Sequence, residues 1–319
     1  MPKLPQIDGL LIVPRLRIQN ANAISSPMTW GFPSMTAFLG LMWKLERLLA
    51  GDIAVVFNGI GVVCHAFEPQ VSRGGFTKSF CLTRNPVGKD GGSASIVEEG
   101  RVHLEVTLVF GVVGDILMAS TTEREAAAAH IAGLLARMRV AGGTVLPGVS
   151  PRSPQLIALE EDEEKQAAQI HAVRRMLLPG SCLVERNDLL ERRHQQLQAT
   201  TPATSRLDAW LDLARTNWRS VVAQDENGTE TVTWQHDRTD GWVVPIPLGY
   251  AGLADLEAPG TVLNARDTTT PFRFVESIYG IGQWVGAHRL KNMHQMLWYS
   301  SADDAAGMYR CCNDFTQYL

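Results

Sequence analysis

No stretch of this 319-residue sequence reaches the roughly 18 consecutive apolar residues that a helix needs to cross a bilayer. The opening segment, MPKLPQIDG, is too polar and too rich in proline for a signal peptide. We therefore expect a cytoplasmic protein. Its 45% hydrophobic and 19% charged content is that of an ordinary globular chain with a sizeable core.

Patterned cysteine is also absent. The five cysteines are an odd number, and no two of them have C-x-x-C spacing. A disulfide framework and a zinc site are therefore not predicted. We expect neither a metal nor a cofactor.

The short motifs of common enzyme classes are missing. GGFTKS and GKDGGS contain glycine and lysine but are not Walker A loops, and there is no G-x-S-x-G or H-E-x-x-H. His65 and His103 fall on predicted strands, where two histidines can serve a metal-independent endoribonuclease as base and acid. The simpler interpretation is one satisfied and one solvent-facing histidine. We predict no catalytic residues, and a small-molecule enzyme would need a convergent pocket that the sequence does not show.

Charge is unevenly distributed along the chain. The net charge of −4 hides a basic stretch at 165–219, which carries nine Lys/Arg against five Asp/Glu and follows the acidic run EEDEE at 160–164. A local basic stretch of this kind is compatible with a nucleic-acid partner even when the whole chain is acidic.

The hydrophobic pattern predicts alternating strands and helices through residue 147. Residues 102–110 alternate apolar and polar side chains, as expected of a strand with one buried face. The expected elements are a strand at 10–14, a helix at 35–49, strands at 53–57 and 60–67 joined by an Asn58-Gly59 hairpin turn, a strand at 102–110, a helix after the capping box Thr122/Glu125, and a strand in TVLP.

This order is the βαββαβ order of a ferredoxin-like or RRM-like domain, so the predicted fold class is α+β. We expect three parts. Residues 8–150 form an RRM-like RNA-binding domain, and residues 151–222 form a mainly helical, basic insertion. Residues 223–319 form a C-terminal part, rich in strands and loops, that packs back on the first domain.

Single-stranded RNA binding is the chemistry that the residues favour. Polar donors suited to phosphates, sugars and base edges follow the first strand. They are Arg15, Arg17, Asn20, Asn22, Ser25 and Ser26. Arg15 and Arg17 stand at alternate positions, which predicts one face of the strand. Trp30 is either a stacking surface for a base or an anchor wedged against the first helix.

Further candidate RNA contacts lie elsewhere in the chain. Their residue types are again guanidinium and amide donors, together with a glycine pair that lets a backbone approach phosphate closely. They are Arg84, Asn85, Arg101, Gly142, Gly143, Arg266 and Arg273. The strands lack the aromatic signature of base-stacking RRM domains, so binding through loops and edges is expected.

Several long segments together resemble one family. They are LLIVPRLRIQNANAISSPMTWGFPS, GVVCHAFEPQVS, LTRNP, IVEEGRVHLEV, MRVAGG, WVVPIPLGY and NARDTTTPFRFVE. They look like the Csy-two family of type I-F CRISPR surveillance complexes, the Cas-five-type members of the RAMP superfamily.

The resemblance implies an RRM-like RAMP domain with a thumb-like helical insertion and no catalytic role. It implies that the protein holds the 5′ handle of the crRNA together with the Cas-eight-type large subunit (Csy-one). It also implies contact with the Cas-seven-type backbone subunit (Csy-three), and it makes target double-stranded DNA a partner of the assembled complex. The alternative that the family allows is a RAMP-type endoribonuclease acting on CRISPR repeat RNA.

Overall fold

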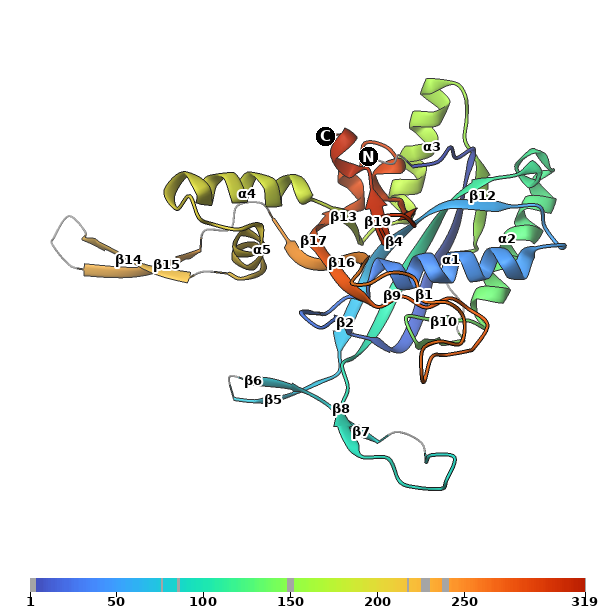
Figure 1. The fold of residues 1–319 in the computed structure, drawn as a ribbon. Helices are drawn as coiled ribbons and strands as arrows, with labels where there is room; N and C mark the ends of the chain where they lie inside the picture. The colour runs from blue at the N-terminus through green and yellow to red at the C-terminus, as the bar shows by residue number, and fades with distance from the viewer. Residues whose placement is uncertain are drawn as a thin grey trace.

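One large antiparallel sheet forms the centre of the molecule (Figure 1). The computed structural model describes residues 4–75, 77–84, 87–147, 152–216, 218–224, 230–236 and 241–318. Within these residues the sheet has 11 strands in the order β10-β11-β1-β9-β4-β13-β17-β16-β19-β18, with β12 also paired to β1. The strands are β1 (Gly9–Asn22), β4 (Val56–Pro69), β9 (Arg101–Val113), β10 (Arg139–Val140), β11 (Gly143–Val145), β12 (Gln155–Ala158), β13 (Ser181–Glu185), β16 (Val243–Gly252), β17 (Val275–Gly286), β18 (Trp298–Asp303) and β19 (Met308–Asn313).

The three long strands β1, β9 and β4 form the middle of this sheet because both of their faces are apolar. The run Leu10–Val13 in β1 is buried throughout, as a continuous apolar stretch predicts. In β9 the even-numbered residues from Val102 to Val112 belong to the main core, whereas His103 and Glu105 are half-buried. The predicted alternation of this strand is confirmed.

Helices cover both faces of the sheet. They are α1 (Met35–Leu49), α2 (Thr121–Leu135), α3 (Glu163–Met176), α4 (Asn187–Thr200) and α5 (Arg206–Ala214), with short 3-10 helices η1 (Asp115–Met118), η2 (Ala287–Arg289), η3 (His294–Met296) and η4 (Phe315–Tyr318). The main core lies under α1 and α2, and a second apolar cluster lies under α3, η2 and η3. No helix in the described part of the chain is long and apolar enough to span a bilayer.

Local capping explains where the first two helices begin. The Ser34 side chain accepts a hydrogen bond from the Thr36 backbone N–H at the start of α1. A capping box starts α2, but it is formed by Ser120 and Glu123, two residues before the predicted pair.

The predicted fold class, a ferredoxin-like or RRM-like domain with a mainly helical insertion, is wrong. The five-residue strand β13 lies inside the supposed insertion and pairs with both β4 and β17. The edge of β4 therefore continues into further strands of one large sheet instead of closing a small domain. The predicted Asn58-Gly59 hairpin is also absent, because β4 runs unbroken from Val56 to Pro69.

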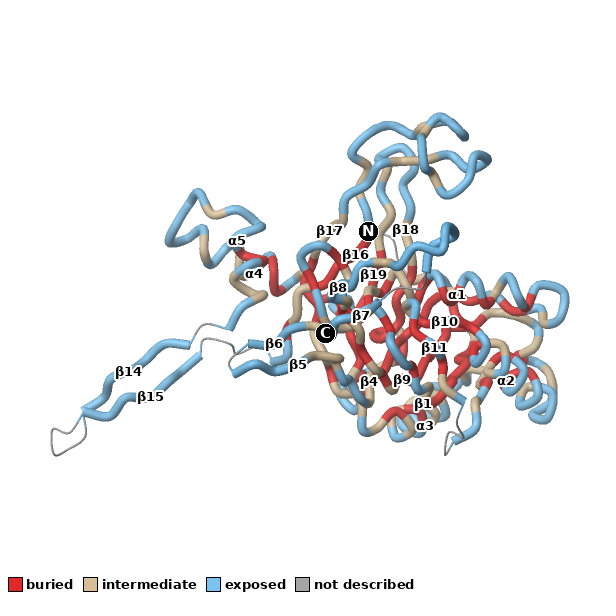
Figure 2. Tube along the Cα trace, turned by 90° about the horizontal axis from the view of Figure 1, so that it is seen from below, coloured by how far each residue is buried: buried red, intermediate tan, exposed pale blue. Residues whose placement is uncertain are grey.

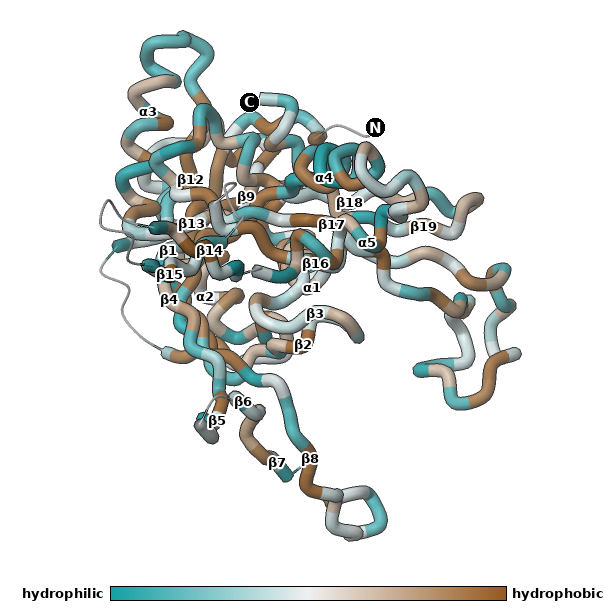
Figure 3. Tube along the Cα trace, turned by 90° about the vertical axis from the view of Figure 1, so that its left-hand side faces the viewer, coloured by the Kyte–Doolittle hydropathy of each residue, from teal (hydrophilic) through white to brown (hydrophobic). Residues whose placement is uncertain are grey.

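Two-stranded ribbons extend from this body (Figures 1 and 2). They are β5 (Val71–Gly74) with β6 (Thr77–Phe80), β7 (Leu82–Arg84) with β8 (Ile96–Glu98), and β14 (Trp218–Gln224) with β15 (Glu230–His236). The hairpin of β2 (Ile24–Ser26) with β3 (Thr29–Trp30) lies against the body, near β16. Every residue of β14 and β15 is exposed. The apolar residues Ile96 and Val97 of β8 are exposed as well, and Figure 3 shows the hydrophobic colour along this strand.

A hydrogen bond between β18 and β13 provides a test of how β13 is held in the sheet. The buried indole N–H of Trp298 donates to the Leu183 carbonyl of β13 at 2.8 Å. Replacing Trp298 with Phe removes this donor, so we expect the free energy of unfolding to fall by about 1–3 kcal/mol in urea titrations. The control Trp43→Phe, at a ring that is 44% exposed, should change it by less than about 0.5 kcal/mol. Equal effects of the two substitutions would contradict this role of Trp298.

Candidate nucleic-acid interface

The predicted polar loop after the first strand is itself largely strand. β1 continues to Asn22, with register shifts between Val13 and Leu16 and between Ile18 and Ala21. Each irregularity holds a residue with positive φ, Arg15 at 55° and Asn20 at 56°. These bulges change the environment of alternate residues, so Arg15 is half-buried and Arg17 is exposed.

Arg15 joins β1 to the segment that precedes β13. Its guanidinium forms an ion pair with Glu105 at 2.7 Å and donates to the Leu178 carbonyl at 3.4 Å. Its backbone N–H donates to the Thr107 hydroxyl at 3.2 Å. The Arg15 side chain therefore has a structural role, in linking these segments. The sequence pattern did not reveal these contacts.

His65 completes this junction. Its Nδ1 donates to the Pro179 carbonyl at 2.6 Å, and its Nε2 lies 2.7 Å from the Thr107 hydroxyl. Burial lowers the pKa of His65, with the positive charge of Arg15 adding to the effect. The ring is neutral near pH 7 and both of its nitrogens are occupied.

His103 is bonded elsewhere. Its Nδ1 accepts the Asn20 backbone N–H at 3.1 Å. About 13 Å of strand separates His103 from Thr107, the partner of His65, at the usual rise of an extended chain. The structure does not bring the two histidines together as a base and acid pair.

The amide and hydroxyls of the predicted loop build the β2–β3 hairpin. The Asn22 side chain accepts from the Ile24 N–H at 3.0 Å and donates to the Ile24 carbonyl at 2.8 Å. The Ser25 and Ser26 hydroxyls lie 2.8 and 2.6 Å from the Thr29 hydroxyl. These polar groups shape the hairpin and set its position at the sheet edge.

A polar cavity of about 650 Å³ opens beside this hairpin. Four of the predicted site residues line it, each from a different segment: Asn22, Ser25, Arg101 and Gly142. Gly142 lies in a tight turn with φ of 78°. Tyr250 of β16 also lines the cavity, a residue that no local sequence signal identified.

Arg101 supplies the positive charge of this cavity but is shared with an acid. Its Nε and Nη2 both donate to Glu99 Oε2, at 3.0 and 2.7 Å. The Arg101 hydrogen bonds lower the pKa of Glu99, which keeps that carboxylate ionised and attached to the guanidinium.

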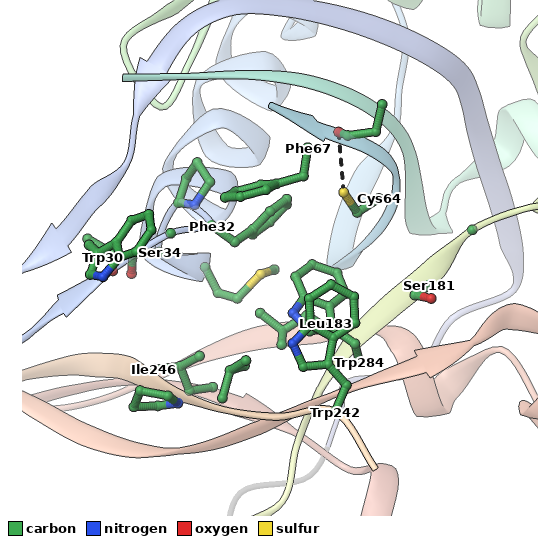
Figure 4. A pocket seen from close by; sticks show the side chains of 18 of the residues that line it. Trp30, Phe32, Ser34, Cys64, Phe67, Ser181, Leu183, Trp242, Ile246 and Trp284 are labelled. Atoms are coloured by element: carbon green, nitrogen blue, oxygen red, sulfur yellow. Dashed lines mark hydrogen bonds between the residues drawn. The ribbon is translucent and has the colours of Figure 1, made fainter. Parts of the chain in front are cut away.

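An aromatic cavity of about 570 Å³ adjoins the polar one (Figure 4). Trp30, Phe32, Phe67, Trp242 and Trp284 contribute rings to it. Trp30 is 57% exposed and meets Phe80 edge-on at 5.7 Å, so the ring is not buried as an anchor in the core. The sequence did not identify Trp242 and Trp284 as site residues, because only the pairing of β16 with β17 brings them together at the aromatic cavity.

The remaining predicted residues lie away from both cavities or outside the described residues. Arg84 is exposed on β7, and Asn85 lies outside the residues that the structure describes. Arg266 is exposed between β16 and β17. Arg273 donates to the Asp304 carbonyl at 3.3 Å, near the far end of β16. Gly143 is buried in β11.

Ion pairs neutralise much of the basic stretch 165–219. Arg193 and Arg215 both bind Asp212, at 2.6 and 3.0 Å. Arg186 binds Asp188 at 2.8 Å. Among the residues that the structure describes, no three metal-ligating side chains gather into a site.

Comparison with known proteins agrees with the sequence resemblance. The family model described as CRISPR-associated protein (Cas_Csy2) matches residues 11–311. The CRISPR-associated protein Csy2 of Pseudomonas aeruginosa strain UCBPP-PA14 is 43% identical over 311 residues, which cover 95% of this chain and 94% of that relative. The chain is thus one of the CRISPR-associated proteins. Within that class it belongs to the Csy2 family, whose members are subunits of the type I-F Csy complex.

The His65 junction predicts a pH dependence of stability. Because the folded-state pKa lies below the unfolded value of about 6.5, the unfolded chain binds the proton first as the pH falls. This contribution to stability is full above about pH 6.5 and is lost as the pH falls toward the folded pKa.

We therefore expect the free energy of unfolding to decline between about pH 7.5 and pH 5.5, and to decline less in His65→Gln. Some decline should remain, since burial also lowers the pKa of His294. Chemical unfolding at a series of pH values measures this, and identical slopes in the two proteins would contradict it.

Proposed function

We propose that this chain is a non-catalytic RNA-binding subunit of a type I-F CRISPR surveillance complex. In this role it holds the 5′ handle of the crRNA together with the large subunit Csy-one. The observation that carries the proposal is the polar cavity, where Asn22, Ser25, Arg101 and Gly142 meet from four separate segments. Family membership supplies the CRISPR context.

The cavity offers donors to a sugar-phosphate chain, beside two carboxylates, Glu98 and Glu99, that also line it. Arg101 offers a guanidinium for a phosphate, and the left-handed turn at Ala141 and Gly142 allows a close backbone approach. Arg17 on β1 is exposed and is a further proposed phosphate contact, whereas Arg15 positions the strand through its bonds to Glu105 and Leu178.

The protruding ribbons are the proposed contacts with other subunits. Their exposed apolar side chains are Leu82, Val97, Trp218, Val222, Val232 and Trp234. An isolated two-stranded ribbon is only marginally stable in water, which favours a partner surface for each of them. Csy-three and target double-stranded DNA are the further partners we propose, with Arg84 and Arg266 as secondary nucleic-acid contacts.

A test of the RNA site uses the Arg101–Glu99 pair. Arg101→Gln should weaken binding of single-stranded CRISPR repeat RNA and lower the salt slope, d log K/d log [salt], by about 0.7 for the lost phosphate contact. Glu99→Gln should strengthen binding, because it removes the carboxylate that competes with phosphate. The control Arg47→Gln, at the end of α1, should leave both quantities unchanged.

Fluorescence anisotropy at several salt concentrations measures these effects. If Glu99→Gln and Arg101→Gln both left affinity and salt slope at wild-type values, the polar cavity would not be the RNA site.

Catalysis has its own test. We expect no cleavage when the purified chain is incubated with CRISPR repeat RNA, because His65 and His103 are engaged separately in the fold. Gel electrophoresis of end-labelled RNA measures this. Cleavage that disappears in His65→Ala or His103→Ala would support the endoribonuclease alternative.

A further inference from the structure

The aromatic cavity and the polar cavity adjoin each other. Ser25, Pro33 and Ser34 line both of them. One side is polar and carries Arg101, while the other is built from tryptophan, phenylalanine and proline side chains (Figure 4). A ligand that spans both must have a polar, charged part joined directly to a flat apolar part.

The described part of the aromatic side carries no formal charge. Among the residues that the structure describes, none that lines it is an Asp, Glu, Lys or Arg. Its two titratable groups are neutral near pH 7, because burial lowers the pKa of His65 and raises that of the Cys64 thiol to about 12. A phosphate has no partner here, whereas an uncharged aromatic group does.

Exposed ring faces mark the cavity as a stacking site. Trp30 and Trp242 are 57% and 61% exposed, although tryptophan is usually among the more buried residue types. Figure 4 shows Trp30 at one end of the cavity and Trp242 with Trp284 at the other. Trp242 and Trp284 lie 5.9 Å apart at a tilt of 42°, which leaves no room for a ring between these two. A base held in this cavity would therefore lie outside the Trp242–Trp284 pair.

A protein strand is a poor fit to the same cavity. β16 pairs with β17 along its whole length, but with β19 only from Gly249 to Ala251. Pro245 and Pro247 stand on the part of β16 that lines the cavity, and neither has a backbone N–H. A strand added to this edge of β16 would meet backbone carbonyl acceptors but would lack the backbone N–H donors that normally alternate with them. The amino groups of a nucleobase can donate to such carbonyls.

We infer that the aromatic cavity holds one unstacked base of the RNA whose sugar-phosphate chain lies in the polar cavity, with Trp30 and Trp242 as its stacking surfaces. This inference rests on the proposed RNA-binding function and assigns the base-holding subsite within it. A base stacked on an aromatic side chain is a recurrent element of single-stranded RNA recognition.

Fluorescence of 2-aminopurine tests the inference on the full-length chain. The analogue replaces successive bases of single-stranded CRISPR repeat RNA, and each RNA is titrated with protein. We expect binding to quench one position selectively. Trp30→Leu or Trp242→Leu should abolish that quenching and lower the affinity by about 5- to 100-fold. Trp43→Leu, at an exposed ring outside both cavities, is the matched control and should change neither.

An abasic nucleotide distinguishes a stacked base from an indirect effect. At the quenched position it should weaken binding by wild-type protein as much as Trp30→Leu does, and should weaken binding by Trp30→Leu no further. Thermal unfolding of each variant verifies the fold.

Three outcomes would overturn the inference. If RNA binds with a normal salt slope but no position is quenched and abasic RNAs bind equally well, the base subsite fails while the proposed function stands. If RNA does not bind at all, the proposed function fails with it. If the Trp30 and Trp242 variants keep their RNA affinity but lose co-purification with another subunit in the absence of RNA, the cavity is a protein contact instead.

Discussion

The pairing of β13 with two neighbours is the constraint on which the rest of the structure depends. This short strand bonds to β4 at Ser181 and Cys182 and to β17 along its whole length. Without it the part of the sheet that carries β1, β9 and β4 would be joined to the part that carries β16 and β17 only by the single pairing of Ile60 in β4 with Trp298 in β18. Both cavities lie across that boundary, since their walls come from β1–β4 on one side and β16 on the other.

A buried polar network secures β13 at its end. Burial raises the pKa of Glu185, and the neighbouring Arg310 counters this by binding the carboxylate. Asn313 accepts from the Glu185 N–H and donates to two carbonyls near η3. The adjacent Asp314 accepts from the Leu4 N–H and from the Tyr299 hydroxyl. Asn313 is thereby held against β13, and Leu4 is held to the neighbouring Asp314. Such a network is costly to leave half satisfied.

Local sequence signals predicted local structure well and long-range structure poorly. The helix at 35–49 and the alternation of β9 are confirmed because apolar periodicity is a property of neighbouring residues. The Asn58-Gly59 turn signal was misleading, since β18 packs against β4 there and a Cβ at Gly59 would lie 3.3 Å from the Leu297 Cβ. β13 was missed because five residues between two helices carry no periodic signal.

The cavity residues Arg101 and Gly142 were predictable from donor type and turn chemistry, whereas Trp242 and Tyr250 reach the cavities only through sheet pairing.

The order of strands also has a consequence for synthesis of the chain. Ile60 on β4 pairs with Trp298, and Cys64 pairs with Ser181, so strands from late in the sequence complete the edge of an early one. Contacts between such distant segments form slowly, because a long loop must close before any of them is gained. In a nascent chain that has emerged only through α2, this edge of β4 therefore has unpaired backbone N–H and C=O groups. Acquisition of the native state therefore depends on segments that are synthesised long after β4.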